Sequence, residues 1–303
     1  RYVTLEMPSV SVLDERDTDV IETGAAELRA LLPPEGPVLV LGIGNRRVTA
    51  DALGPRTAQK ILVTGCLAQR YQEEILQEMP EVDGVLGTGS YFDVANAVGQ
   101  VLGGKRYKRF DDINADQSED GRILTTPEYY AYLKIAEGCD NHCAYCIIPK
   151  LRGKLRSRPI EELVKEAEQL AADGVKELIV VAQDTSRYGL DLYGERKLAE
   201  LLRQLCRIDG LVWIRVHYLY PDEMSQELID VLANEPKIVK YLDIPIQHIN
   251  DDILRRMNRR GNGEYVKELF AKLRREIPGL VLRTSLITGL PGEGGRGGIC
   301  PAL

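Results

Sequence analysis

The stretch EGCDNHCAYC, residues 137–146, carries three cysteines on one short loop: Cys139, Cys143 and Cys146. It directly follows YAYLKIA (130–136), which is a predicted strand. A structural zinc site usually ends with four protein ligands, and this loop offers no fourth ligand except His142. Three thiolates suit a cubane iron–sulfur cluster that keeps one iron open. The spacing therefore favours a [4Fe–4S] cluster, with zinc and ordinary packing of the cysteines as the alternatives.

The residues after this loop alternate between predicted helices and strands up to about residue 290. In PIEELVKEAEQLAADG (159–174), apolar residues recur at helical spacing between a starting proline and a closing glycine. Four further strands are predicted: KELIVVAQD (176–184), LVWIRVHYL (211–219), VKYLDIPI (239–246) and LVLRTSLITG (280–289). Such an α/β alternation predicts a parallel sheet, hence an open or closed β/α barrel, with a Rossmann-like open sheet as the alternative. In β/α barrels, functional loops follow the carboxyl ends of the strands, and the cysteine loop satisfies that rule.

Composition limits the classes of function. The 303-residue chain has a formal net charge of −7 and a pI near 5.3. This acidic balance argues against non-specific electrostatic binding of nucleic acid, and no specific DNA binding is predicted. It contains no apolar run of about 18 residues, so no membrane span is predicted. Six clustered cysteines and the absence of a secretory signal favour the reducing cytoplasm.

The region before the cysteine loop divides into segments. Residues 59–110 predict strand–helix–strand–helix, including helices at 68–79 and 92–104. Residues 111–128 contain the acidic stretch DDINADQSEDGR and predict a surface linker. The β/α core is predicted over 129–293, while the tail 294–303 has no periodicity and is expected to be unrelated.

The cysteine spacing, with the aromatic Tyr145 before the last cysteine, resembles the signature of the radical S-adenosylmethionine (SAM) superfamily. The segment YLKIAEGCDNHCAYCIIPKLRGKLRSR is similar to that of the methylthiotransferases. The resemblance covers about residues 60–293, and the RimO type in particular is matched by VAQDTSRYG (181–189), VHYLYP (216–221), DIPIQH (243–248) and MNRRG (257–261).

The resemblance implies a fold and a chemistry. It implies a radical SAM barrel that is incomplete here, preceded by a truncated flavodoxin-like α/β domain. The three cysteines would hold a [4Fe–4S] cluster whose open iron binds SAM, and reductive cleavage would give a 5′-deoxyadenosyl radical. The family then adds a methylthio group to the β-carbon of an aspartate in a small-subunit ribosomal protein. An electron donor such as flavodoxin or ferredoxin would be needed.

The resemblance also implies residues close to SAM. These are Tyr145, Gln183 and Gln247, together with Arg283 and Ile287 on the fifth strand. An ordinary hydrogen bond at a strand end is the alternative for each polar side chain. The basic residues between 150 and 158 suggest either a solvated loop or a patch that steers a partner.

RimO-type enzymes hold a second, auxiliary [4Fe–4S] cluster through three cysteines of the N-terminal domain. TGCLAQRY matches the third of these ligands, Cys66, and no cysteine precedes it in this chain. One thiolate cannot hold a cubane, so we expect the auxiliary cluster to be absent and methylthiolation to be impaired. Cys206 lies on the apolar face of a predicted helix and is expected to pack in the core.

Residues 1–58 resemble the germination protease of spore-forming bacteria rather than a methylthiotransferase. Asp51, in VTADALGP, matches one of two aspartates implicated in that atypical aspartic protease. A single carboxylate does not provide an acid/base pair, so endopeptidase activity is the weaker alternative function. The two resemblances meet near residues 59–64, and we expect the chain to be a chimera or a fragment, with an inactive remnant as the third hypothesis.

Overall fold

The computed structural model describes residues 60–115, 124, 127–291 and 293. The chain divides into two compact units, Arg1–Ser118 and Glu119–Leu303, which we describe separately. The division falls within the predicted linker 111–128. The germination-protease-like segment 1–58 with Asp51, and the tail 294–303, lie outside the described residues.

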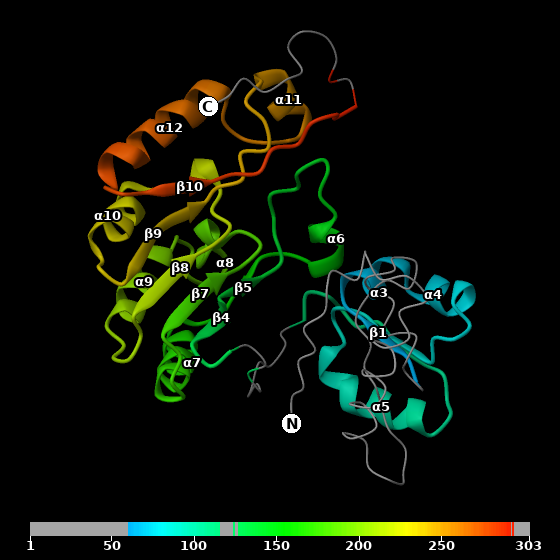
Figure 1. Ribbon diagram of the computed structural model, residues 1–303. Coiled ribbons are helices and arrows are strands. Elements are labelled where there is room, and N and C mark those ends of the chain that lie inside the picture. The colour runs from blue at the N-terminus through cyan, green and yellow to red at the C-terminus, as the bar shows by residue number, and fades with distance from the viewer. Residues whose placement is uncertain (1–59, 116–123, 125–126, 292, 294–303) are drawn as a thin grey trace, which may run out of the picture. The chain divides into compact units, whose positions relative to one another are not determined.

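The described part of the first unit is a small parallel α/β structure (Figure 1). The strands β1, β2 and β3 pair in that order, and both pairings are parallel. The elements are β1 (Leu62–Thr64), α3 (Cys66–Tyr71), α4 (Glu73–Glu78), β2 (Gly84–Leu86), η3 (Tyr91–Asp93), α5 (Val94–Leu102) and β3 (Tyr107–Arg109). The single helix expected over 68–79 was wrong, because Gln72 takes a left-handed φ of 44° and separates α3 from α4. The sequence also did not predict β3.

Neighbouring residues of β2 show why this unit has helices on both faces of its sheet. Val85 packs in one apolar cluster with residues of α3 and α4, whereas Leu86 packs in another with residues of α5. Successive side chains of a strand point to opposite faces, so a strand with two adjacent buried residues needs cover on both. This arrangement agrees with the truncated flavodoxin-like domain that the resemblance implies.

The second unit is built on a five-stranded parallel sheet, ordered β10-β9-β8-β7-β4. All four pairings are parallel. The strands are β4 (Tyr130–Lys134), β7 (Glu177–Val181), β8 (Trp213–Val216), β9 (Ile238–Asp243) and β10 (Val281–Arg283). Spatial order follows chain order without reversal, which is the order of a β/α barrel rather than of a doubly wound sheet. The predicted α/β fold with parallel strands is confirmed as an open sheet, and the described strands do not close into a barrel.

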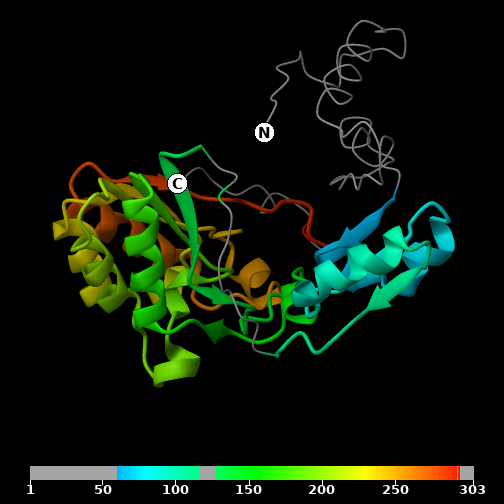
Figure 2. The same cartoon turned by 90° about the horizontal axis from the view of Figure 1, so that it is seen from below.

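Helices cover one face of this sheet. The long helices are α7 (Ile160–Ala172), α9 (Leu198–Cys206), α10 (Gln226–Asn234) and α12 (Gly263–Glu276). They lie in a row in which each contacts the next along the chain, and Figure 2 shows the same row from below. Their apolar sides and the buried strand residues form one large core, which includes Leu163, Leu178 and Leu201. The other elements are β5 (Ala136–Glu137), α6 (Ile148–Arg152), β6 (Arg156–Ser157), η4 (Thr185–Arg187), α8 (Leu190–Tyr193), η5 (Pro221–Glu223) and α11 (Asp251–Arg256).

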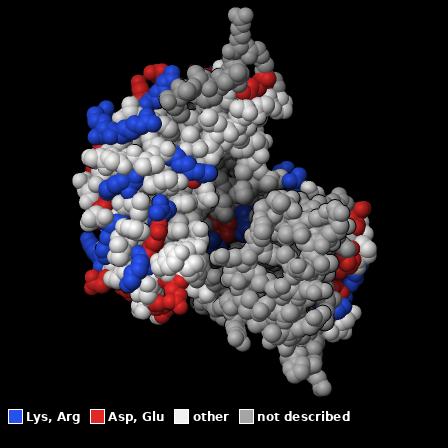
Figure 3. All heavy atoms as spheres, in the orientation of Figure 1, with Lys and Arg blue, Asp and Glu red and all other residues white. Residues whose placement is uncertain are grey.

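Within the described ranges, no helix is both long enough and apolar enough to cross a membrane. On the face seen in Figure 3, acidic and basic side chains are interspersed over the second unit rather than gathered by sign. In the basic run 150–158, Arg152 pairs with Glu137 at 3.4 Å and Arg158 with Glu166 at 2.8 Å. Their charges thus take part in the structure of the loop, which favours the solvated-loop interpretation over a steering patch.

Candidate functional site

The cysteine loop is held at both ends by backbone contacts. Strand β5 leads into the loop and pairs with β6, which follows it, through Ala136 and Ser157. Gly138 takes a φ of 79°, and the N–H of the next residue, Cys139, donates to Gly153 O at 3.1 Å. The loop therefore projects from the carboxyl end of β4 as a closed unit, at the place where β/α barrels carry their chemistry.

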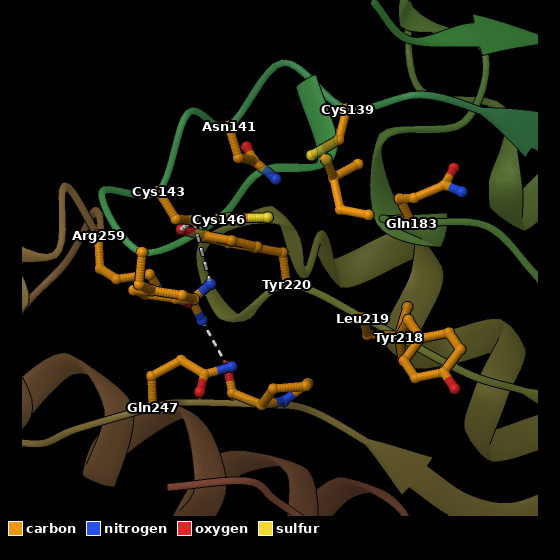
Figure 4. A pocket seen from close by; sticks show the side chains of 13 residues that line it. Cys139, Asn141, Cys143, Cys146, Gln183, Tyr218, Leu219, Tyr220, Gln247 and Arg259 are labelled. Carbon is orange, nitrogen blue, oxygen red and sulfur yellow. Dashed lines mark hydrogen bonds between the residues drawn. The ribbon is translucent and has the colours of Figure 1, made fainter. Parts of the chain in front are cut away.

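The three cysteines line one cavity of about 180 Å³ (Figure 4). The other walls come from residues that follow β7, β8 and β9, so the cavity lies over the carboxyl ends of the sheet strands. Its lining is Cys139, Asn141, Cys143, Tyr145, Cys146, Ile148, Gln183, Tyr218, Leu219, Tyr220, Pro245, Gln247 and Arg259.

Most of the residues predicted from the sequence meet at this cavity. The cysteines, Tyr145, Gln183 and Gln247 all line it. Arg283 and Ile287 do not: Arg283 Nη1 donates to Asp243 Oδ2 at 2.6 Å, and the N–H of Ile287 donates to Gln247 O at 2.8 Å. Ile287 thus supports the backbone of a lining residue rather than facing the cavity itself.

The two remaining described cysteines lie elsewhere. Cys66 begins α3 in the first unit. Cys206 ends α9 and packs against the core of the second unit, and burial raises the pKa of its thiol to about 11.

Sequence analysis missed several lining residues, of which Asn141, Tyr220 and Arg259 make the most specific contacts. Asn141 Nδ2 donates to Asp184 Oδ2 at 2.6 Å, and Asp184 is 2% exposed. Burial raises the pKa of this carboxyl, while hydrogen bonds from Ser186 and Asn141 lower it. Tyr220 and Arg259 occur in the quoted motifs VHYLYP and MNRRG, but nothing in their local sequence indicates that they reach a cysteine.

Burial also affects the thiol that begins the loop. Desolvation raises the pKa of Cys139, and a hydrogen bond from the backbone N–H of Asn141 acts in the opposite direction. The thiolate is the form that binds metals, and partial burial of this thiol disfavours that form.

Most of the described non-glycine residues with a positive φ lie around the cavity. The described non-glycine residues with positive φ are Gln72, His142, Tyr218, Gln247 and Asn258. All except Gln72 lie in the cysteine loop, in the lining, or in the MNRRG segment beside the loop. Strain of this kind is costly and persists where the surrounding structure enforces it, most often at functional sites.

The arrangement fits a cluster better than a single ion. In the described ranges no three His, Cys, Asp or Glu side chains converge as ligands of one metal ion, which a tetrahedral zinc requires. A cubane binds each cysteine through a different iron, so its thiolates stand further apart around a shared cavity. Gln183 offers an acceptor for a ligand of the cavity. Its Nε2 donates to Glu137 Oε1 at 2.9 Å, while its Oε1 is buried and accepts no hydrogen bond from the described residues.

A family model described as the radical SAM superfamily matches residues 133–296, more than half of the chain. The chain belongs to the radical SAM superfamily. This membership confirms the resemblance to the radical SAM superfamily, and with it the predicted cofactor class of a [4Fe–4S] cluster with SAM. A second model, germination protease, matches residues 1–90, most of which lie outside the described residues.

Several relatives are named ribosomal protein uS12 methylthiotransferase RimO. The protein of Lachnoclostridium phytofermentans is 59% identical over 234 residues, which are 77% of this chain and 53% of the relative. That of Geotalea uraniireducens is 46% identical over 294 residues, 96% of this chain and 64% of the relative. This radical SAM chain thus spans between half and two thirds of the length of these relatives.

Solved structures agree with the fold. The radical SAM methyltransferase TsrM from Kitasatospora setae, solved with tryptophan and a SAM analogue, has a TM-score of 0.61 at 16% identity. That match covers 91% of this chain and 60% of TsrM. A second TsrM structure, with cobalamin and a [4Fe–4S] cluster bound, has a TM-score of 0.54 at 17% identity, covering 76% of this chain and 51% of TsrM. At these identities the likeness is one of fold.

Proposed function

We propose that this chain is a RimO-type radical SAM methylthiotransferase that modifies the β-carbon of an aspartate in a small-subunit ribosomal protein. One observation supports the proposal above others: Cys139, Cys143 and Cys146 line a single cavity with Gln183 and Gln247 at the carboxyl ends of parallel strands. The name shared by its high-identity relatives supports the same activity.

Each residue of the cavity has a proposed task. The three thiolates would hold the cluster, and three protein ligands would leave one iron open for SAM. The Oε1 of Gln183, which is buried without a hydrogen bond from the described residues, would accept one from SAM, which would recover the cost of burying that acceptor alone. Gln247, on a strained backbone with a φ of 68°, also lines the cavity and would contact SAM. When bound, the cluster and SAM supply the electron transfer and hydrogen abstraction that no side chain provides.

The wider assignments belong to the same proposal. Tyr145 lines the cavity. Arg283 and Ile287 lie outside the lining and would act on SAM only indirectly, Arg283 through its ion pair with Asp243 and Ile287 through its backbone hydrogen bond to Gln247. Residues 1–58 form a germination-protease-like segment, 59–110 a truncated methylthiotransferase domain, 111–128 a linker, and 129–293 the radical SAM core. A flavodoxin or ferredoxin supplies electrons, and the enzyme acts in the cytoplasm.

Anaerobic reconstitution with iron and sulfide tests the cluster site. We expect the purified chain to gain broad visible absorption and to release 5′-deoxyadenosine from SAM in the presence of a reductant. The variant Cys143→Ala should lose most of the bound iron and all of the SAM cleavage, because two thiolates do not hold a cubane. Cys206→Ala is the matched control, since Cys206 packs in the core away from the cavity and its loss should leave iron content unchanged.

Two further results decide between the hypotheses. A colourless, zinc-loaded protein, or a Cys143→Ala variant that keeps its iron, would overturn the cluster assignment. Cys66→Ala should also leave the iron content unchanged if the auxiliary cluster is absent. Methylthiolation itself is tested by mass spectrometry of the ribosomal protein after incubation with the reconstituted chain, and an unmodified aspartate beside active SAM cleavage would separate radical formation from sulfur transfer.

A further inference from the structure

Four consecutive residues, 257–260, brace the cysteine loop from one side. Three hydrogen bonds join this brace to the loop: Ala144 N to Met257 O at 2.9 Å, Asn258 Nδ2 to His142 O at 2.9 Å, and Arg260 Nη2 to Asn141 Oδ1 at 3.2 Å. The partners lie more than a hundred residues apart in the sequence. The brace therefore fixes the loop through tertiary contacts rather than through local turn chemistry.

Arg259 is the member of the brace that reaches a cysteine. Its Nη1 lies 3.9 Å from Cys143 Sγ, and its Nη2 donates to Pro245 O. Its Cζ lies 3.8 Å from the centroid of the Tyr220 ring, within cation–π range. Only 9% of the residue is exposed. Figure 4 shows its side chain beside Cys143 and Tyr220. The guanidinium is thus held in place on three sides.

The charge of Arg259 has no acidic partner in the part of the chain that the structure describes. The neighbouring Arg260 differs, because its Nη1 lies 3.0 Å from Glu223 Oε1. Arg255, on α11, pairs with Asp252 at 2.8 Å and is largely exposed. A buried cation without a carboxylate is costly unless other negative charge compensates it. The nearest candidate for that charge is the thiolate of Cys143.

Cys143 also receives a second polar contact. Tyr220 Oη lies 3.7 Å from Cys143 Sγ, so the hydroxyl and the guanidinium converge on the same sulfur. Among the described residues, no side chain makes such a contact with the sulfur of Cys139 or Cys146. Cys143 is therefore distinguished from the other two by its side-chain contacts, whereas Cys139 has a hydrogen bond from the backbone N–H of Asn141.

We propose that Arg259 is a positioning residue that sets the reduction potential of the cluster through the Cys143 thiolate. Potentials of iron–sulfur clusters depend on net charge and on hydrogen bonds to the ligand sulfurs. Reduction adds a negative charge, which a fixed and largely buried cation within a few ångströms of a ligand sulfur favours. Arg259 thus makes the cluster easier to reduce. This inference rests on the cluster site that we propose above.

Redox titration of the reconstituted cluster tests the inference without SAM present. In Arg259→Gln, which keeps a polar side chain but loses the charge, we expect the ratio of reduced to oxidised cluster at a given potential to fall about tenfold, a shift of about 59 mV for a one-electron couple. Arg259→Lys, which keeps the charge, should remain closer to the wild-type midpoint. The matched control Arg255→Gln removes an exposed arginine next to the brace and should not shift the midpoint.

Each other outcome has a definite meaning. An Arg259→Gln cluster with the wild-type midpoint, or an equal shift in Arg255→Gln, overturns the inference. If that unchanged midpoint is accompanied by weaker SAM binding in a separate binding titration, Arg259 would instead be assigned to the carboxylate of SAM. Should Arg259→Gln fail to fold by circular dichroism, Arg259→Lys decides, since a full shift despite the retained charge overturns the inference. A wild-type chain that binds no cluster overturns the proposed function as well, so the two failures are distinguishable.

Discussion

At the scale of single residues, Gly138 shows how tightly the cysteine loop is built. Its φ of 79° is left-handed, and an added Cβ would lie 1.9 Å from Lys154 O, a backbone atom that cannot move aside on its own. The close approach comes from the pairing of β5 with β6, which brings residues 153–154 against the start of the loop. Any side chain at this position must therefore displace the loop that carries the cysteines.

We predict that Gly138→Ala abolishes cluster binding. The clash and the left-handed backbone together should cost about 1–3 kcal/mol or more, and the shifted loop should no longer present Cys139 to the cavity. Iron content after anaerobic reconstitution measures the loss of cluster binding, and urea unfolding measures the loss of stability.

Gly174→Ala is the matched control for this prediction. Gly174 has a φ of 104°, but an added Cβ there meets no atom within 4 Å. It should lose about 1 kcal/mol of stability through backbone strain alone and should keep its iron. A Gly138→Ala variant with wild-type iron content would contradict the account of the loop.

Sequence reasoning at the residue scale indicated three cysteines that line the cavity, but not the side chains around them. The spacing of the three cysteines within one loop indicates a metal or cluster site. Tyr220 and Arg259 reach Cys143 from 77 and 116 residues away, and each is an ordinary tyrosine or arginine in its local sequence. Periodicity and short motifs describe near neighbours in the chain, so contacts of this range are outside what they can indicate.

At the scale of elements, short α11 carries the chain into the brace. Its first turn is capped by Asn250, whose Oδ1 accepts from the N–H groups of Asp252 and Ile253 at 3.0 and 3.2 Å. The helix ends at Arg256, directly before residues 257–260. Such a short helix depends on its cap and its packing rather than on propensity.

We predict that Asn250→Ala destabilises the second unit by about 1 kcal/mol, because it leaves two N–H groups of α11 without their acceptor. Hydrogen exchange should rise in α11 and the brace more than elsewhere. Asn250→Asp should keep the wild-type value, since Asp caps helices as well as Asn. Equal exchange in α11 of the wild type and Asn250→Ala would show that packing alone holds the helix.

Elements themselves were largely predictable. Helix α7 starts after Pro159 and ends before Gly174, as the sequence indicates, because proline fits the first turn and glycine the left-handed end. The break at Gln72 was not predictable, since the periodicity of residues 68–79 continues through it. The apolar pattern of this segment indicated which residues are buried, but not that two short helices carry them instead of one.

At the scale of the whole molecule, the two units have separate apolar cores. Leu86 on β2 is fully buried in a cluster of the first unit, and Leu178 on β7 is fully buried in the core of the second. No buried apolar cluster of the described residues combines the two units. Each unit therefore has its own source of hydrophobic stabilisation.

We predict that unfolding is not a single transition. Leu178→Ala should lower the stability of the second unit by about 2–5 kcal/mol through the cavity it leaves, while the transition of the first unit stays in place. Leu86→Ala should do the reverse. Calorimetry of the two variants measures both effects. One cooperative transition that moves equally in the two variants would show that the units unfold together.

The sequence by itself determined the candidate cysteine loop, the family and the alternation of strands and helices. Each is encoded in local spacing: three cysteines on one loop, apolar periods of two and 3.6, and contiguous motifs. Only the tertiary structure decided which side chains surround those ligands. Parallel strands bring the ends of β4, β7, β8 and β9 to one edge, so residues remote in the chain share a cavity. That convergence brings Arg259 and Tyr220 into contact with Cys143. It results from long-range packing, which the local sequence around each of these three residues does not indicate.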